Sequence, residues 1–491
     1  MINEGIMLPF YTLLGILPIM AVVVHALGKT KEKFLLANVS YIASYVLLAC
    51  LSVKIRSTGI SELPLFSLRK AFVLNPTSLT LATLMTFASH MLLLGAYMNR
   101  KSVMDKFDVI LFMLFSAYGI IFSDNLIVLL LFMEIGLVST AFLFIERNRE
   151  SIEATVKMTI MLILGGIFLA IGFSGLYLIL RSKGLDLIAL SLSYLSGTPQ
   201  LEQGSMSILT LLFFTLILVG MGIEVGLVPF YMWLPDVYTG PMAIASAFFI
   251  LLVDTADLYA LLRVLPLYEH ILTGTYTIKM LFTNVVVLIS VISFILGELS
   301  ALTQRRLRRI FGYSGIADAG YTLLLATYLA ILGISIVKPS IPLAIATFFI
   351  LFSNIALSNI VSLIGLGETK GITTIDDIRG LPWRFPLLSA NLIISLLSLA
   401  GVPPLAGFMA KFFVISAISS TFRRLIVILV IIFFGVCAAY VLRVIATLWS
   451  KTSRVTREEE SVIQLIPFII LNVLLIICGI YPRLILEFMM R

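Results

Sequence analysis

The sequence predicts an all-α polytopic membrane protein. Of its 491 residues, 60% are hydrophobic and only 12% are charged, and the mean hydropathy is +1.11. A water-soluble protein carries about 25% charged residues to cover its surface, so a soluble protein of this length is excluded. Long apolar runs recur along the chain, and short loops between them hold most of the Lys and Arg residues. This pattern is typical of transmembrane helices joined by short loops.

About fourteen membrane spans are expected, because each crossing needs roughly 20 apolar residues. The first run, Pro9 to Leu27, lacks the basic start and the small-residue cleavage site of a signal peptide. Ser57–Ser78 is too polar to span, and the longest loop, Arg181–Ser207, is a candidate for a short interfacial helix. The spans are expected to begin near Pro9, Phe34, Leu79, Phe107, Asn125, Thr155, Ile208, Ala243, Ile278, Gly312, Ile341, Leu387, Leu425 and Val462.

The basic residues predict how the chain is oriented in the membrane. The odd-numbered loops carry 18 of the 34 Lys and Arg residues, the other side carries 12, and four lie inside spans. Cytoplasmic loops of membrane proteins are enriched in Lys and Arg. The odd-numbered loops are therefore expected in the cytoplasm and both termini outside.

The sequence carries no signature of a cofactor or a catalytic centre. Cys50, Cys437 and Cys478 each stand alone in an apolar run, whereas iron–sulfur clusters and structural zinc need several closely spaced thiolates. There is no Walker or dinucleotide fingerprint, and the net charge of +8 is spread over short loops. We expect no metal, no cofactor and no nucleic-acid partner for this chain, and any redox chemistry must belong to a partner.

Two predicted spans contain proline where a helix should continue, at Pro229 in span 7 and at Pro403 and Pro404 in span 12. Broken helices at membrane depth are tolerated where the freed backbone lies inside protein or lines a cavity, and paired breaks are typical of transporters with inverted repeats. The glycine pair Gly165-Gly166 is interpreted as a site of close helix packing. The expected units are three N-terminal helices (1–106), a first repeat (107–265), a second, inverted repeat (278–449) and a C-terminal helix (450–491).

Six ionisable residues fall within predicted spans. Each such residue costs roughly 2.5–3.5 kcal/mol to insert, so it marks either an ion route or a charge that snorkels or pairs to hold helices together. The six candidates for an ion relay are Glu134, Glu224, Asp254, Asp257, Asp318 and Lys411.

Four segments carry a resemblance to a known family. They are Asn125–Ser139, the run GIEVGLVPFYMWLPD at 222–236, QRRLRRIFGYS at 304–314 and GVPPLAGFMAKF at 401–412. Together they resemble the antiporter-like subunits of complex I, of Mrp sodium/proton antiporters (the D-type above all) and of membrane-bound hydrogenases. The resemblance implies a subunit of a prokaryotic membrane complex, with an antiporter-like paralogue and redox subunits that hold iron–sulfur clusters as partners.

The family's buried axis of lysines, histidines and glutamates is altered in this chain. Glu134 and Lys411 match it, but Glu224 stands at a lysine position and Asp318 at a histidine position. Three further positions have lost their ionisable residue and are interpreted as degenerate: Thr255, Ile355 and Asn359.

Two consequences follow from these replacements. At about 100° per residue, Asp254 and Asp257 share a face that differs from that of Thr255, so they are not expected to replace the lost lysine. Glu134 would face Glu224, and two close carboxylates in a low-dielectric site cannot both stay ionised cheaply. One of them would then hold a proton, or a cation such as sodium would lie between them.

Three functions remain open from the sequence. The preferred one is an antiporter-like subunit of a redox-driven proton or sodium pump, with a degenerate relay and a largely structural role. The alternatives are an active subunit with a rewired carboxylate axis, or a subunit of a stand-alone Mrp-type antiporter. An independent transporter is permitted by the repeats but disfavoured by the family motifs, and an enzyme is disfavoured because no nucleotide, metal or nucleophile motif is present.

Overall fold

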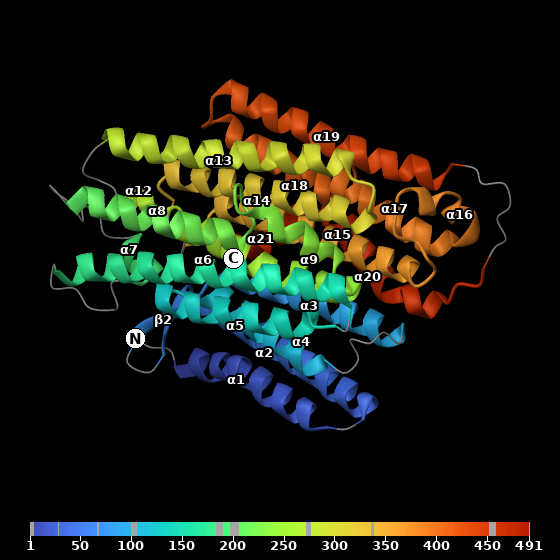
Figure 1. Cartoon of the computed structure of the whole chain (residues 1–491). Coiled ribbons are helices and arrows are strands. Elements are labelled where there is room, and N and C mark those ends of the chain that lie inside the picture. Colours follow the sequence, from blue (N-terminus) through green and yellow to red (C-terminus); the bar gives the residue numbers. More distant parts are fainter. Residues whose placement is uncertain are drawn as a thin grey trace.

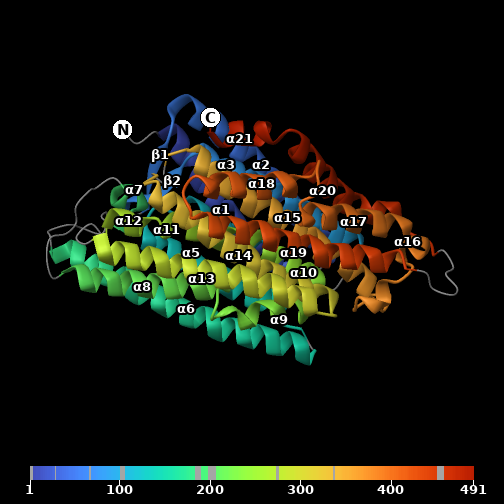
Figure 2. The ribbon, with the colours of Figure 1, turned by 90° about the horizontal axis from the view of Figure 1, so that it is seen from above.

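The computed structural model describes residues 4–27, 29–65, 68–99, 106–146, 148–182, 190–196, 206–271, 276–334, 338–450 and 458–490. The chain forms one bundle of helices that run side by side along a common direction (Figure 1). The N-terminal helices lie at one edge of the bundle and α19 (Arg424–Leu448) at the opposite edge. Both chain ends lie toward the same face, beside a small β hairpin (Figure 2).

The N-terminal part packs three long helices against the hairpin. Asn75 caps α3 by accepting a hydrogen bond from Ser78 N, and Asn75 N donates to Ser78 Oγ in return. This capping box fixes where the hairpin ends and α3 begins. The elements are α1 (Glu4–Ala26), α2 (Thr30–Thr58), β1 (Ser61–Leu65), β2 (Leu68–Leu74) and α3 (Pro76–Met98).

The middle of the chain contributes a large share of the core. Its last long helix is made of three consecutive stretches that are buried throughout: α10 (Ala243–Phe248), a π-helix η4 (Phe249–Asp254) and α11 (Thr255–Val264). The other elements are α4 (Phe107–Phe122), α5 (Leu126–Phe144), α6 (Arg149–Ser182), α7 (Leu192–Leu195), α8 (Met206–Glu224), η3 (Tyr231–Trp233), α9 (Leu234–Thr239) and α12 (Leu267–Ile271).

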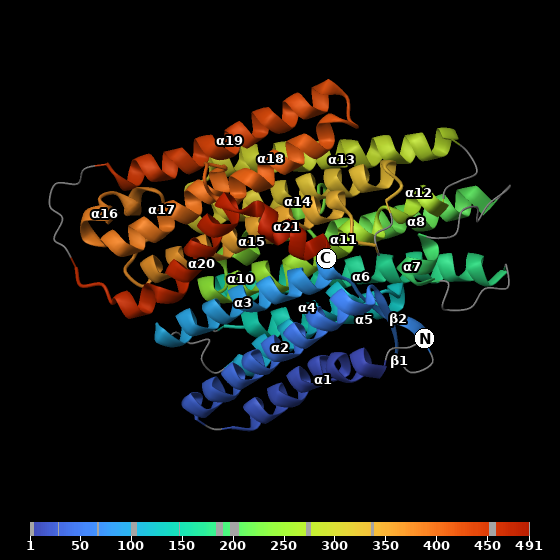
Figure 3. The same cartoon turned by 180° about the vertical axis from the view of Figure 1, so that it is seen from behind.

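The last part packs α13 and α14 against the middle and places α20 and α21 over α3 (Figure 3). Its elements are α13 (Tyr276–Thr303), α14 (Leu307–Ile331), α15 (Ile341–Glu368), η5 (Asp376–Ile378), α16 (Leu381–Arg384), α17 (Pro386–Ala400), α18 (Ala406–Ser419), α19, α20 (Val462–Ile480) and α21 (Pro482–Met490).

Two helices are interrupted at the proline motifs. After α8 ends at Glu224, Gly226 takes a φ of 68° and the chain continues through η3 into α9. The freed backbone finds side-chain partners: Trp233 Nε1 donates to Ile223 O at 3.2 Å, and Val228 N donates to Ser293 Oγ on α13 at 3.1 Å. Between α17 and α18, Gly401 takes a φ of 79°. The backbone groups freed at the first break thus form hydrogen bonds within the protein, which is required at a depth where the membrane offers no water.

The membrane fold is confirmed, and the structure refines it. Within the described residues, eleven helices are long and apolar enough to cross a membrane, and four shorter apolar helices accompany them. Two of the short ones, α17 and α18, are the halves of predicted span 12, so the count of fourteen and the inverted relation of the repeats remain predictions. The polar segment after α2 is a β hairpin, not irregular chain, because Leu63, Phe72 and Val73 bury their side chains against the helices.

Described parts of several odd-numbered loops lie at one end of the bundle, where Arg308 pairs with Glu368 and Arg384 with Glu458. Which side of the membrane this end faces stays a prediction. The opposite end holds the hairpin and both chain ends, since Lys54 Nζ donates to Gly5 O and Thr77 Oγ1 donates to Met489 O. The two termini therefore share one face.

Candidate ion-translocation axis

The axis begins at two carboxylates that reach the same glycine pair. Glu134 projects from α5 toward Gly166 on α6, where a Cβ atom would overlap its Oε1. Glu224, the last residue of α8, is buried, and its Oε1 lies 3.0 Å from the Cβ position of Gly165. Two neighbouring glycines therefore give room to two carboxylates. The pair also allows the close helix packing that was expected, since a Cβ atom on Gly220 of α8 would lie 2.9 Å from Gly165 O.

Asp257 on α11 continues the line. It is buried and lies within electrostatic range of Glu134, Glu224 and Asp254. Its Oδ1 makes no hydrogen bond to any residue that the structure describes. A buried carboxylate oxygen without a partner is costly and is typical of functional positions.

The π-helix η4 changes how Asp254 and Thr255 are presented. Thr255 Oγ1 donates to Ile250 O, five residues earlier, at 2.9 Å. Asn354 Nδ2 on α15 approaches both side chains, at 3.2 Å from Asp254 Oδ2 and 2.9 Å from Thr255 Oγ1. Asn354 thus contacts both side chains, and that Asp254 does not replace the lost lysine at Thr255 stays a prediction.

Asp318 on α14 forms the middle of the second half. It accepts a hydrogen bond from Ser353 Oγ on α15 and lies within electrostatic range of Asp254 and of Lys411. The buried carboxylates of the two halves of the chain are therefore neighbours at this point.

The second half ends on a buried cluster around Lys411 of α18. Its Nζ makes no hydrogen bond within the described part of the chain and lies 4.9 Å from the centroid of the Phe434 ring. Glu298 on α13 is only 1% exposed, accepts a hydrogen bond from Tyr321 OH at 3.3 Å and is an electrostatic neighbour of Lys411. Sequence reasoning missed Glu298. It is the one carboxylate in the apolar run from Lys279 to Thr303, so the rule that selected Glu134 would have found it.

Two of the substituted family positions carry other contacts. Ile355 is fully buried. Asn359 Nδ2 donates to Ser395 Oγ at 2.9 Å and to Asn472 Oδ1 at 3.1 Å, while Asn472 Nδ2 donates to Asn391. These neutral amides link α15, α17 and α20 at the position where a lysine was expected.

The family motif at the end of the broken helix α8–α9 lies at the odd-loop face. Asp236 accepts from Lys157 at 3.0 Å and from Arg309 at 2.8 Å, and it lines a cavity of about 320 Å³ together with Glu150, Glu153 and Arg306.

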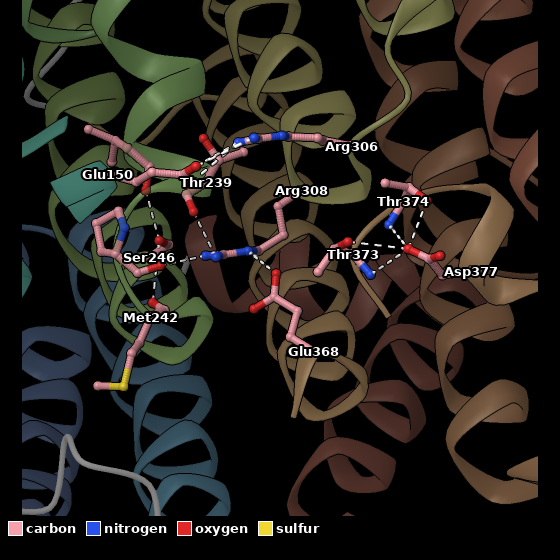
Figure 4. Close-up of polar contacts among 12 residues, drawn as sticks. Glu150, Thr239, Met242, Ser246, Arg306, Arg308, Glu368, Thr373, Thr374 and Asp377 are labelled. Atoms are coloured by element: carbon pink, nitrogen blue, oxygen red, sulfur yellow. Dashed lines mark hydrogen bonds and ion pairs between the residues drawn. The ribbon is translucent and has the colours of Figure 1, made fainter. Parts of the chain in front are cut away.

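Beside this cavity, Arg308 joins three elements (Figure 4). It donates to Thr239 O at 2.8 Å and to Pro241 O at 2.7 Å, and it pairs with Glu368 at 2.6 Å. Arg308 therefore ties the end of the first broken helix to α14 and α15.

The axis residues are spread in a line. Among the described residues, no three His, Cys, Asp or Glu side chains are gathered closely enough to hold a metal ion. The order along the axis is Glu134, Glu224, Asp257, Asp254, Asp318, Glu298 and Lys411.

A helical bundle with two interrupted helices, crossed by a series of buried and half-buried carboxylates that ends on a lysine, defines an antiporter-like membrane subunit. Residues 123–438 match the family model described as NADH:quinone oxidoreductase/Mrp antiporter, TM. The chain therefore belongs to this family. Its members serve in complex I-like respiratory complexes and in related Mrp and sulfane sulfur reductase complexes.

Relatives and solved structures agree with this assignment. NADH-quinone oxidoreductase subunit N of Desulfitobacterium hafniense is 34% identical over 263 residues, which cover 49% of this chain and 51%, about half, of that relative. Subunit N 2 of Acidobacterium capsulatum is 28% identical over 78% of this chain and 76% of its own length.

Two solved structures share the fold over nearly the whole chain. One is a chain of the membrane-bound sulfane sulfur reductase, an archaeal respiratory membrane complex (TM-score 0.83, 25% identity, 98% of this chain and 96% of the other). The other is a chain of the Mrp complex from Dietzia sp. (TM-score 0.82, 17% identity, 99% and 96%).

Proposed function

We propose that this chain is an antiporter-like subunit of a multi-subunit, redox-driven pump, and that its rewired carboxylate axis conducts protons. The observation that carries the proposal is the continuity of the axis, which runs from Glu134 to Lys411 through buried ionisable side chains of both halves. Ionisable residues inside a membrane are functional by default, and proton relays are built from such chains.

The charge balance of the axis supports protons as the mobile species. Six carboxylates share the axis with one lysine. In a low-dielectric interior, close carboxylates cannot all be ionised, so protons or cations must accompany them. A line of separated carboxylates suits proton transfer better than it suits a cation cage, since hard cations require several oxygen ligands around one point.

The cavity around Asp236 offers access from the odd-loop face. Its lining is charged, and it lies where the broken helix α8–α9 ends, on the same element as Glu224. The two glutamates at Gly165-Gly166 are the nearest part of the axis along that helix. We infer that protons enter here from the cytoplasm and that both termini lie outside, as the distribution of Lys and Arg predicts.

A structural role with a degenerate relay is the second candidate. It is favoured by the positions where the family relay is lost, since Ile355 is apolar and Asn359 is held among neutral amides. In that case the chain would act as a scaffold between pumping modules. In either case we infer an antiporter-like paralogue as neighbour and redox subunits with iron–sulfur clusters elsewhere in the complex, in a prokaryotic cell membrane.

Transport by the assembled native complex decides between these functions. Glu224→Gln and Lys411→Ala would be compared with Glu32→Gln, an exposed glutamate at the start of α2. We expect both axis variants to assemble normally and to lose coupled proton uptake at least tenfold, with the control unchanged. Full transport by both axis variants would instead establish the scaffold. A change in sodium dependence alone would assign the axis to sodium.

The partners are tested by purification from native membranes in mild detergent. Redox subunits and an antiporter-like paralogue are expected in the purified complex. Small Mrp-type subunits without redox partners would point to a secondary antiporter, and recovery of this chain alone would contradict the proposed complex.

A further inference from the structure

A groove opens on the termini face between α2, α3, α20 and α21. Its volume is about 400 Å³, and it is lined among others by Ile55, Leu79, Leu84 and Ile477. The helix α21 lies over α3 beside it (Figures 2 and 3). None of the axis residues lines this groove, so it is separate from the proposed proton route.

The groove has apolar walls although three hydroxyl residues line it. Ser52, Thr80 and Thr83 each donate to the carbonyl four residues earlier in their own helix, at 2.7–2.8 Å. Their hydrogen-bonding capacity is therefore used within the helix, and they present carbon to the groove. Such walls suit a hydrocarbon chain and offer nothing to orient a polar ligand.

A cationic group stands at the mouth of the groove. Arg56, near the end of α2, places its guanidinium 4.7 Å from the centroid of the Phe488 ring and forms no ion pair with any described residue. A second cavity of about 360 Å³ shares Arg56, Leu484 and Phe488 with the groove and adds Arg483, whose side chain is 89% exposed. An apolar slot thus opens onto a compartment with two arginines.

The helix α21 has the character of an interfacial helix. Ile485 and Met489 are buried against the bundle, while Arg483 and Glu487 pair at 2.6 Å on its polar side. Thr77 Oγ1 donates to Met489 O at 2.8 Å, which ties α21 to the start of α3. Amphipathic helices of this kind lie at the level of the lipid headgroups. The arginines at the mouth are therefore at headgroup depth, with the groove extending toward the hydrocarbon.

We propose that this groove binds a phospholipid with an anionic headgroup. One acyl chain fills the apolar slot, and the lipid phosphate pairs with Arg56, with Arg483 close to the rest of the headgroup. Charge complementarity favours an anionic lipid, because Arg56 forms no ion pair with a described carboxylate and lies at the depth of the lipid phosphates. A bidentate guanidinium–phosphate contact is among the stronger charge-assisted hydrogen bonds.

Native mass spectrometry tests the site on the intact complex, reconstituted in nanodiscs of phosphatidylcholine with a minor share of phosphatidylglycerol. We expect the wild type to retain phosphatidylglycerol in preference to phosphatidylcholine. Arg56→Gln should lower that retention about fivefold, the loss of one basic contact near a membrane surface. Arg424→Gln is the matched control, since it removes an exposed arginine at the start of α19.

A second variant keeps every charge and fills the slot. Thr83→Trp places an indole where the acyl chain would lie, and it should reduce retention of both lipids while proton uptake by the complex is unchanged. Equal retention of phosphatidylglycerol by wild type, Arg56→Gln and Thr83→Trp would overturn the proposal. So would a photo-crosslinker at Phe488 that captures a protein chain in place of lipid.

Discussion

The glycine pair of α6 permits a test that moves one carboxylate without removing it. In a Gly166→Ala variant the new methyl group would overlap Oε1 of Glu134 and stand 3.1 Å from its Cδ. Oε1 would lie only 1.9 Å from the new methyl carbon, whereas non-bonded atoms prefer separations above about 3 Å, so this oxygen must withdraw by more than about 1 Å. The residue that must give way is the far end of a flexible side chain, so the helices themselves need not move.

The substitution is expected to change proton uptake much more than the free energy of unfolding. Alanine gains about 1 kcal/mol over glycine in a helix interior, and an off-rotamer glutamate costs about 0.5–1.5 kcal/mol, so the net change in unfolding free energy is close to zero. A displacement of this size in a proton-transfer site can cost a factor on the order of ten to one hundred in rate. We therefore expect a stable complex with strongly reduced proton uptake.

The assay combines thermal unfolding of the purified complex with proton uptake in proteoliposomes. Gly435→Ala on α19 is the matched control, because nothing lies within 4 Å of its Cβ position. Full proton uptake by a stable Gly166→Ala complex would refute the role of Glu134 in the axis. Loss of stability together with uptake would show that the glycine serves packing.

Three further predictions follow from single contacts. Arg308→Ala removes the hydrogen bonds to Thr239 O and the pair with Glu368, so the complex should lose about 1–3 kcal/mol of stability, the size of a lost charge-assisted contact with a partly exposed carboxylate; an unchanged unfolding temperature would contradict this. Glu298→Gln removes the carboxylate beside Lys411 and should slow proton uptake at least tenfold in an assembled complex, and normal uptake would remove Glu298 from the axis. Hydrogen bonds from the side chain of Thr374 and from neighbouring groups lower the pKa of Asp377, so its contribution to loop stability is present above pH about 4 and is lost as pH falls through the lowered value; the protection factor of the Thr374 amide against hydrogen exchange, corrected for the intrinsic rate at each pH, should fall on acidification in the wild type and show no such fall in Asp377→Asn.

Hydropathy and proline were sufficient to predict most of the fold. The apolar runs gave helices near every expected start, and Pro229, Pro403 and Pro404 mark the places where α8 and α17 are interrupted. The β hairpin was not predicted, because its burial depends on contacts such as the bridge from Phe72 to Ser123. Such pairing over 50 residues leaves no local signal in the sequence.

The candidate site was predicted less completely, for two physical reasons. The π-helix at Phe249–Asp254 was not predicted, because no residue in this apolar run signals the wider turn. Glu298 was missed although the rule that selected Glu134 applies to it, since both are carboxylates within an apolar run. Its burial depends on the packing of α13 against α14 and α19, which the sequence alone does not show.

The distribution of charge divides the axis into two halves with different chemistry. Glu134, Glu224 and Asp257 have only carboxylates as electrostatic neighbours within the axis, so their charge can change only when protons or cations arrive or leave. Glu298 and Lys411 pair a carboxylate with an amine, so a proton can be redistributed between the two side chains. The two halves meet where Asp254 neighbours Asp318, and the amide of Asn354 binds on one side of that junction. The reversal at Glu224 therefore does more than remove one lysine: among the described axis residues it leaves Lys411 as the single basic side chain against six carboxylates.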